Sequence, residues 1–386
     1  MDDEGVFRIP GAPVDAVFID PPALLSSGYV DFALESSTYY ARNVRNHERE
    51  QCIGEKRKRK KKKAVLNPKE VLAQQRHQEA REILLESHKA FMSNEPAQAK
   101  LKEMVKLKTS NAKVEDNSDF IALSQTFQAP LYDITLSSQG KCVPLFNNLV
   151  EASSSAEEVA SSAGSDFLLP KNSRFLMTDF SEIHRLIPDS PSTGYNLIII
   201  DPPWENKSVH RRSIYPTLPN KYLLSLPLQQ LVHSSGALIG LWITNREKLH
   251  QFVEKELFPA WKLIPVGVWY WLKITDAGTM VSELDLNHHK PYECLLVAST
   301  LMQDHNDVPH RRVAITVPGQ HSRKPPLGVL LADFAPKPVR ALELFAREMN
   351  ANWTSWGNEP LRFQGKSYFV ERVPEDLTLS GNDTIA

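Results

Sequence analysis

The residues best suited to chemistry in this chain are Asp201, Pro202, Pro203 and Trp204, which directly follow the apolar residues 198–200. The apolar run predicts a buried strand, and the prolines end it because they lack an N–H for a sheet and fix the backbone angle φ. Asp201 is therefore expected at the carboxyl end of a strand, where open α/β sheets bind ligands. A carboxylate, rigid carbonyl groups and a flat aromatic ring together suit a planar base with an exocyclic amine.

The amine of adenine or cytosine is a poor nucleophile because its lone pair is delocalised into the ring. Asp201 and the Pro202 carbonyl can accept its two N–H bonds and hold the nitrogen closer to tetrahedral, while Trp204 stacks on the ring. A methyl donor would then be attacked in line, with most of the rate coming from positioning. The alternative is that Asp-Pro-Pro is only a turn, and those three residues alone favour the turn.

A second copy of the pattern gives an internal comparison. Asp20, Pro21 and Pro22 follow the apolar residues 16–19, but Ala23 stands where the aromatic ring would be. Without a stacking ring, this copy is predicted to be a turn.

The composition fits an ordinary globular protein. The 386 residues are enough for two domains, or for one domain with an extension, and 41% of them are hydrophobic and 24% charged. No apolar stretch approaches the roughly 20 residues that span a bilayer, and the first residues are acidic where a secretory signal is basic. We therefore expect an intracellular protein without a membrane partner. Three widely separated cysteines predict neither disulfides nor a zinc pair, and no metal is expected.

Residues 56–63 (KRKRKKKK) are eight consecutive cations in a chain whose net charge is only −1. Such a run must be solvated or bound to polyanions. A nuclear import signal is the favoured interpretation, with a nucleic-acid tether and a plain solvated run as alternatives. The predicted location is the nucleus, with the cytosol as the alternative.

Composition shifts divide the chain into six segments. Helices are expected within residues 68–107, divided at Pro96. The segments are a weakly structured start (1–55), the basic run (56–63), a helical region (64–150), a serine-rich linker (151–166), an α/β domain (167–370) and a tail (371–386).

Within residues 167–370, strands alternate with helices. One helix is expected at residues 245–257, with Asn245 as a possible N-cap, and another at 325–334. This alternation predicts an α/β fold with a largely parallel sheet and helices on both faces. The predicted strands are 174–177, 196–200, 237–244, 263–274, 294–298, 313–317 and 341–345.

Nucleotide-type cofactors are usually bound by a glycine-rich turn and by a later acidic residue that contacts the ribose. No such turn occurs, and the nearest equivalent is Glu343 within the apolar residues 342–347. This strand follows the Asp201 motif instead of preceding it. The order implies a circularly permuted sheet, with the reactive loop early and the cofactor strand last.

Four motifs in this order resemble a known family, the S-adenosylmethionine-dependent adenine-N6 methyltransferases of the DPPW type. They are Asp201-Pro202-Pro203-Trp204, His321-Ser322-Arg323-Lys324-Pro325, Glu343-Leu344-Phe345-Ala346-Arg347 and Trp356-Gly357-Asn358-Glu359. One motif would be weak evidence, whereas four in order are specific. The resemblance covers about residues 167–370, implies a Rossmann-like methyltransferase domain there, and implies S-adenosylmethionine as cofactor.

The resemblance also implies roles for single residues. Lys324 would meet the methionine carboxylate of the cofactor, Glu343 its ribose hydroxyls, and Asn358 with Glu359 its ribose or adenine. Asp201, Arg347 and Asn350 would lie beside the same molecule. Family relatives have glutamine where this chain has Glu359. Taken without the family, a surface lysine is the favoured interpretation of Lys324. A carboxylate in an apolar strand needs a partner, and for Glu343 that partner is either a ribose hydroxyl or, as the alternative, Arg340 or Arg347.

The loop after Trp204 is polar and basic and contains one aromatic residue. Together with Trp204, this loop is expected to bind the phosphate backbone and a splayed base of the substrate. The loop residues concerned are Asn206, Lys207, Arg211, Arg212 and Tyr215. The alternative is a solvated loop without a binding role.

We therefore expect an N6-adenine methyltransferase that acts on RNA as a monomer. The residues that flank the motifs resemble those of one branch of the family. This resemblance implies that the substrate is an internal adenosine of a small nuclear RNA, plain or already 2′-O-methylated. DNA adenine, cytosine N4 and a non-catalytic nucleic-acid-binding subunit are the alternatives. The complete motif argues against an inactive subunit.

Overall fold

The computed structural model describes residues 5–40, 68–107, 134–162, 164–205, 219–285, 290–301, 307–320 and 323–372. Its centre is an 11-stranded sheet in the order β1-β2-β14-β12-β13-β11-β10-β15-β16-β9-β6. Six of the ten neighbouring pairs are parallel, which confirms the predicted α/β class. The strands are β1 Val6–Arg8, β2 Asp15–Ile19, β6 Leu149–Glu151, β9 Arg174–Met177, β10 Leu197–Ile200, β11 Leu238–Ile243, β12 Ile264–Lys273, β13 Tyr292–Ser299, β14 Arg311–Thr316, β15 Ala341–Leu344 and β16 Trp353–Gly357.

The seven predicted strands correspond to β9 to β15, with ends that differ by no more than two residues. They were recognisable because strands buried on both faces read as continuous apolar runs. In β10 all four residues, Leu-Ile-Ile-Ile, are buried. Two hydrophobic cores result, one on each face of the sheet.

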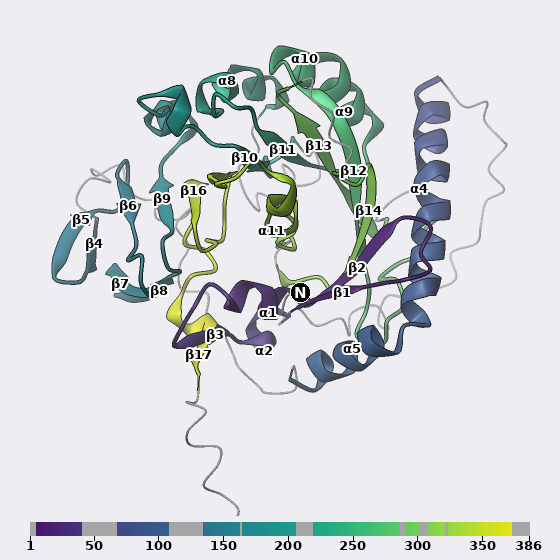
Figure 1. Cartoon of the computed structure of the whole chain (residues 1–386), viewed down its shortest axis with the longest axis horizontal. Coiled ribbons are helices and arrows are strands. Elements are labelled where there is room, and N and C mark those ends of the chain that lie inside the picture. Colours follow the sequence, from purple (N-terminus) through teal and green to yellow (C-terminus); the bar gives the residue numbers. More distant parts are fainter. Residues whose placement is uncertain are drawn as a thin grey trace, which may run out of the picture.

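Helices cover both faces. Figure 1 shows α4 (Pro68–Met92) beside β12 and β14, and α11 (Leu327–Leu331) in front of the middle of the sheet. The predicted division into two helices is confirmed, but it falls at residues 93–94, and Pro96 lies in the first turn of α5 (Glu95–Leu107). The remaining helices described after residue 107 are η2 Phe180–Leu186, η3 Pro191–Thr193, η4 Asn220–Ser225, α8 Leu228–Leu231, α9 Glu247–Phe252, the π-helix η5 Val253–Leu257, α10 Phe258–Ala260, η7 Ala332–Phe334 and η8 Lys366–Tyr368.

The predicted N-cap of the 245–257 helix is wrong. Arg246 occupies the cap position, while the Asn245 side chain donates a 2.6 Å hydrogen bond to the Tyr292 carbonyl. Asn245 thus ties the end of β11 to the start of β13.

The start of the chain is more ordered than its sequence suggested. Residues 5–40 form β1, β2, α1 (Pro21–Ser26), β3 (Phe32–Leu34) and α2 (Ser36–Tyr39). β2 extends the central sheet parallel to β14, with Val17 opposite Ala314. Prolines and glycines flank this short apolar run, so the local sequence pattern did not predict a strand. The strand is stabilised by pairing with β14, which is distant in the sequence.

The Asp20 copy of the motif begins a helix, so it is more than a turn. Asp20 is the N-cap of α1 and accepts a 3.4 Å hydrogen bond from the Ala23 N–H, with Pro21 in the first turn. Asp20 also forms an ion pair with Lys100 of α5 at 3.3 Å.

Two further expectations are corrected between residues 134 and 166. The described end of the predicted helical region and the predicted linker form a small sheet, in the order β5-β4-β7-β8. Serines do not weaken it, because they alternate between faces and bond to the backbone; Ser162 Oγ donates to the Thr135 carbonyl at 2.8 Å. Its strands are β4 Thr135–Ser138, β5 Lys141–Pro144, β7 Glu158–Ser162 and β8 Ser165–Leu169.

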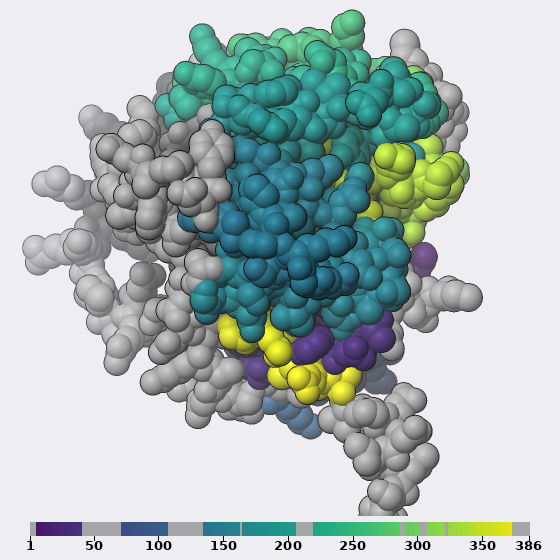
Figure 2. All heavy atoms as spheres, turned by 90° about the vertical axis from the view of Figure 1, so that its left-hand side faces the viewer, coloured from purple at the N-terminus to yellow at the C-terminus, as the bar shows by residue number. Residues whose placement is uncertain are grey.

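Figure 2 shows this small sheet, in blue, next to C-terminal residues in yellow and N-terminal residues in purple. An early and a late segment of the described residues pair here, since β17 (Phe369–Glu371) runs antiparallel to β3. Glu157 strengthens the junction by accepting backbone N–H bonds from Val30, Asp31 and Phe32. The basic run 56–63 and residues 373–386 lie outside the described residues.

Among the described helices, none is long and apolar enough to cross a membrane. In the same part of the chain, no three His, Cys, Asp or Glu side chains cluster as a metal site would require.

Replacing Phe18 of β2 with alanine tests whether the first strand belongs to the core. Phe18 is 0% exposed, and its ring centroid lies 5.2 Å from that of Phe91 in α4. Phe18→Ala should lower the free energy of unfolding by about 3–5 kcal/mol in urea denaturation. Phe7→Ala on the edge strand β1 is the matched control and should cost less than half as much. Equal, small effects of both changes would show that β2 is peripheral.

Candidate active site

The Asp-Pro-Pro-Trp segment lies at the carboxyl end of β10, as predicted. The Asp201 N–H donates to the Leu344 carbonyl at 3.3 Å, and the Trp204 N–H donates to the Pro202 carbonyl at 2.7 Å. The segment is therefore a tight turn, and the turn itself presents Asp201 at the sheet edge. The Pro202 carbonyl oxygen retains a second lone pair for another donor.

Trp204 is held more firmly than a free stacking platform would be. It is only 9% exposed, and its indole Nε1–H donates to the Trp242 carbonyl at 2.8 Å. The ring thus forms a fixed wall beside Asp201, and its contact with a base stays a prediction.

Lys324 is the centre of the charged groups at this edge. Its Nζ lies 3.3 Å from Asp201 Oδ2 and 3.3 Å from Glu293 Oε2. Burial would lower the pKa of Lys324, but the charges of Asp201 and Glu293 raise it above its ordinary value. Lys324 is therefore a charged, half-buried residue of the site and not a surface lysine.

Glu293, at the start of β13, is a site residue that the sequence did not reveal. It also forms an ion pair with Lys273 at the end of β12. Burial would raise the pKa of Glu293, but Lys324 and Lys273 outweigh burial and hold it at about 2. The only signal in the sequence is a single charged residue at the start of an apolar run, which is also common at the surface.

Glu343 lies on the strand next to Asp201. β10 and β15 are parallel neighbours in which Ile199 faces Glu343 and Ile200 faces Leu344, so their carboxyl ends meet. The strand of Asp201 thus precedes the strand of Glu343 in the sequence and lies beside it in the sheet, in keeping with the predicted permuted order. Because side chains alternate along a strand, Glu343 shares the face of Ala341, which α11 covers.

The carboxyl group of Glu343 has an unusual proton affinity. Burial raises its pKa to about 8, and the nearby charges of Glu348 and Asp201 add to the effect. Its hydrogen-bond partner is Asn350, whose Nδ2 donates to Oε2 at 3.4 Å. A half-buried carboxyl with one long hydrogen bond can accept further donors.

The remaining predicted cofactor residues surround this edge to different degrees. Asn358 is exposed immediately after β16, whose strand lies beside β15. Glu359 is 8% exposed, and its Oε2 pairs with Arg362 Nη1 at 2.7 Å, so part of its hydrogen-bonding capacity is used internally. The Arg347 guanidinium lies 5.8 Å from the centre of the Phe363 ring.

Several predicted residues lie outside the described part of the chain. They are Asn206, Lys207, Arg211, Arg212 and Tyr215 of the polar loop, and His321 and Ser322 before Arg323. Their roles stay predictions.

Two cavities lie away from Asp201. One of about 100 Å³ separates α4 from the sheet and is lined by Arg76, His250 and Lys290 among others. The other, of about 370 Å³, lies between α1 and α11. Neither is lined by Asp201 or Lys324, but the second is lined by Asn350, the hydrogen-bond partner of Glu343, so this cavity reaches the far side of the site.

Comparison with known proteins connects this edge to a family. A family model described as MT-A70 matches residues 195–359. The chain is 39% identical over 237 residues to the N(6)-adenine-specific methyltransferase METTL4 of Mus musculus, which covers 58% of this chain and 50% of the relative. For METTL4 of Homo sapiens the identity is 37% over 257 residues, covering 64% and 53%.

Other relatives carry different names. The N6-methyladenosine RNA methyltransferase MTA1 of Cryphonectria parasitica is 35% identical over 212 residues, covering 53% of this chain and 62% of the relative. The DNA N6-methyl methyltransferase of Caenorhabditis elegans is 33% identical over 233 residues, covering 59% and 63%.

The chain spans about half the length of the METTL4 relatives. METTL4 is the branch that the residues around the motifs resemble, and both matches confirm that relationship. The matched region contains Asp201, Glu293, Lys324, Glu343 and Asn358, and over this region the chain is similar to the MT-A70 family.

Proposed function

We propose that this protein transfers a methyl group from S-adenosylmethionine to N6 of adenosine in RNA. The observation that carries the proposal is the ion pair of Lys324 with Asp201, next to Glu343 on the adjoining parallel strand. This arrangement places Asp201, which suits an amine, at the same sheet edge as Lys324 and Glu343, which suit the methyl donor. The MT-A70 match and the names of the relatives support the same reaction.

The described residues fit the donor molecule. An ammonium group has three N–H bonds, and Asp201 and Glu293 use two of those of Lys324. The third suits the carboxylate of the methionine part. Glu343 can accept from ribose hydroxyls, and the carboxylates nearby favour a sulfonium cation.

The donor, when bound, supplies a methyl group on a positively charged sulfur. Asp201 and the Pro202 carbonyl would hold the N6 amine by its hydrogens, so that its lone pair faces that methyl carbon. The amine would take the methyl group that the donor supplies, the electron pair of the broken S–C bond would stay on sulfur, and the excess proton would leave nitrogen along the hydrogen bond to Asp201. Lys324 fixes Asp201 in place, so catalysis would rest mainly on positioning.

Asp201→Asn tests the role of the carboxylate. The amide keeps the size of the side chain but offers only one acceptor oxygen, so methyl transfer should fall by about 100-fold or more, while binding of RNA persists. The measurement is turnover with labelled donor at saturating concentrations.

The chain provides a matched control in its second Asp-Pro-Pro segment. Asp20→Asn alters a helix N-cap and an ion pair away from Lys324, so it should change stability and leave turnover as it is. Unchanged turnover in Asp201→Asn would remove Asp201 from the mechanism.

Glu343→Gln tests the raised pKa. Between pH 4.5 and about pH 8, Glu343 holds a proton in the folded state that it has released in the unfolded chain. The free energy of unfolding of the wild type should therefore fall as pH rises through this window. Glutamine does not titrate, so the variant should lose less stability between about pH 5 and about pH 8 in urea denaturation. Identical slopes for the two proteins would contradict the raised pKa.

The substrate proposal is finer. We propose an internal adenosine of a small nuclear RNA, plain or 2′-O-methylated, on the basis of the resemblance to METTL4. The basic run 56–63 supports a nuclear location, and the complete set of motifs supports action as a monomer. DNA is the second candidate because the Caenorhabditis elegans relative is named a DNA methyltransferase.

Methylation of RNA and DNA oligonucleotides of one sequence distinguishes the substrates, with the product nucleosides identified by mass. N6-methyladenosine in RNA, enhanced when the target ribose carries a 2′-O-methyl group, is the expected result. N4-methylcytosine would contradict the adenine assignment, and faster reaction of DNA would replace RNA. Donor binding without any product would indicate a non-catalytic subunit.

A further inference from the structure

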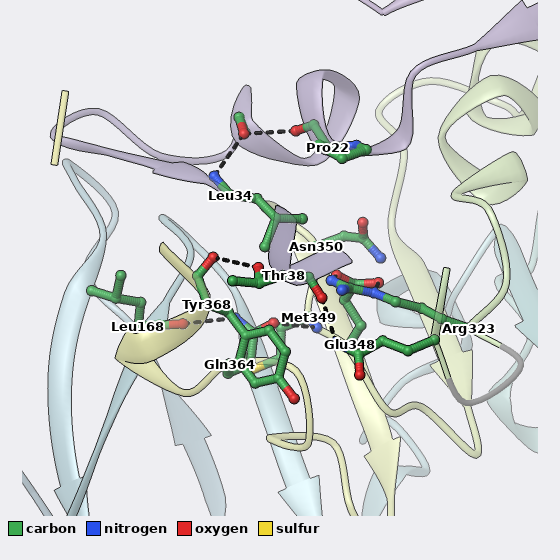
Figure 3. Close-up of polar contacts among 12 residues, drawn as sticks. Pro22, Leu34, Thr38, Leu168, Arg323, Glu348, Met349, Asn350, Gln364 and Tyr368 are labelled. Carbon is green, nitrogen blue, oxygen red and sulfur yellow. Dashed lines mark hydrogen bonds and ion pairs between the residues drawn. The ribbon is translucent and has the colours of Figure 1, made fainter. Parts of the chain in front are cut away.

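Arg323, which directly precedes Lys324, is enclosed by aromatic rings. It is 2% exposed, and its guanidinium carbon lies 4.3 Å from the centre of the Tyr39 ring and 4.4 Å from that of Phe363. Nε donates to Glu348 Oε2 at 3.0 Å, and Nη2 contacts the other carboxylate oxygen. Figure 3 shows Arg323 and Glu348 reaching toward each other beneath the N-terminal segment. The two rings thus fix the plane of the Arg323 guanidinium group, and the ion pair with Glu348 fixes the direction in which it points.

The loop that leads to Lys324 rests on α2. Gln320 Nε2 donates to the Thr38 carbonyl, and the Arg323 N–H donates to the Gln320 carbonyl at 2.9 Å. At Gly319 a Cβ would lie 2.8 Å from Tyr39 Cε1, so only glycine permits this approach. Consecutive Cα atoms are about 3.8 Å apart, so fixing Arg323 strongly restricts the backbone of Lys324.

Glu348, on the other side of the ion pair, belongs to the loop between β15 and β16. The same loop contains Asn350, which donates to Glu343. Gln364 holds the loop by accepting from the Met349 N–H at 3.2 Å and donating to Tyr29 Oη and the Leu168 carbonyl. The Arg323–Glu348 pair therefore joins the Lys324 loop to a braced loop that contacts Glu343.

We propose that Arg323 is a positioning residue for the methyl donor, which sets Lys324 and Glu343 relative to each other, and that Tyr39 of the N-terminal segment completes its clamp. The inference rests on the proposed function. Arginine is suited to this task because its planar fork binds a carboxylate through two nitrogens while both flat faces stack on rings. Lysine would keep the charge and lose both features.

The competing explanation is that the clamp only stabilises the fold. The chain contains a second clamp of the same chemistry as a control. The Arg312 guanidinium carbon lies 4.4 Å from the centre of the Trp269 ring and 5.5 Å from that of Phe334, and Arg312 pairs with Asp15 of β2. Arg312 is near the amino end of β14, at the sheet edge opposite Lys324.

The experiment compares Arg323→Lys with Arg312→Lys in the full chain. S-adenosylmethionine binding is measured by titration calorimetry and stability by urea denaturation. Both variants should lose stability, but only Arg323→Lys should raise the Kd for the donor, by about 10-fold, the scale known for residues that orient a binding group. If both variants bind the donor as the wild type does, the clamp is purely structural and the inference is wrong.

Tyr39 provides a second test with a built-in rescue. Tyr39→Leu removes the ring and should raise the Kd, whereas Tyr39→Phe keeps the ring and should restore wild-type binding. Equal binding by the leucine variant and the wild type would remove Tyr39 from the inference. A wild type that binds no donor would overturn the proposed function and this inference together. Donor binding by the wild type that is unchanged in Arg323→Lys would overturn this inference alone.

Discussion

The ion pair between Lys324 and Asp201 is the interaction on which the site depends. Two carboxylates converge on one ammonium, and Lys273 pairs with the second of them, so the charges alternate and none stands alone. An isolated charge in such a half-buried place would be costly. Because the chain of pairs extends over β10, β12 and β13, the position of the reactive carboxylate is set by the sheet and not by its own loop.

The N-terminal segment supports this arrangement from outside the matched family region. Its strand β2 extends the sheet, and its helix α2 supports the loop before Lys324. Two arginines, each stacked between aromatic rings and paired with a carboxylate, fasten it at opposite edges of the sheet. The region that matches the MT-A70 family model is thus enlarged by residues that precede it by more than a hundred positions.

The sequence predicted what local pattern or motif order encodes. The strands β9 to β15 were visible as apolar runs, and Lys324, Asp201 and Glu343 were predicted to meet. β2 was missed because its partner β14 lies far along the chain, and β7 was missed because a serine-rich strand resembles a linker. Glu293 and Arg323 could not be assigned, because one charged residue reveals nothing until Lys273, Tyr39 and Phe363 are known to surround it.

The pairing of β2 with β14 also affects how the protein is made. During synthesis on the ribosome, residues 15–19 emerge long before residues 311–316, and β15 and β16 emerge later still. Until then the early apolar strand has no sheet to join, and pairing between such distant segments is intrinsically slow. The nascent chain must therefore keep Phe18 and its neighbours from aggregating until residues 311–316 have been synthesised.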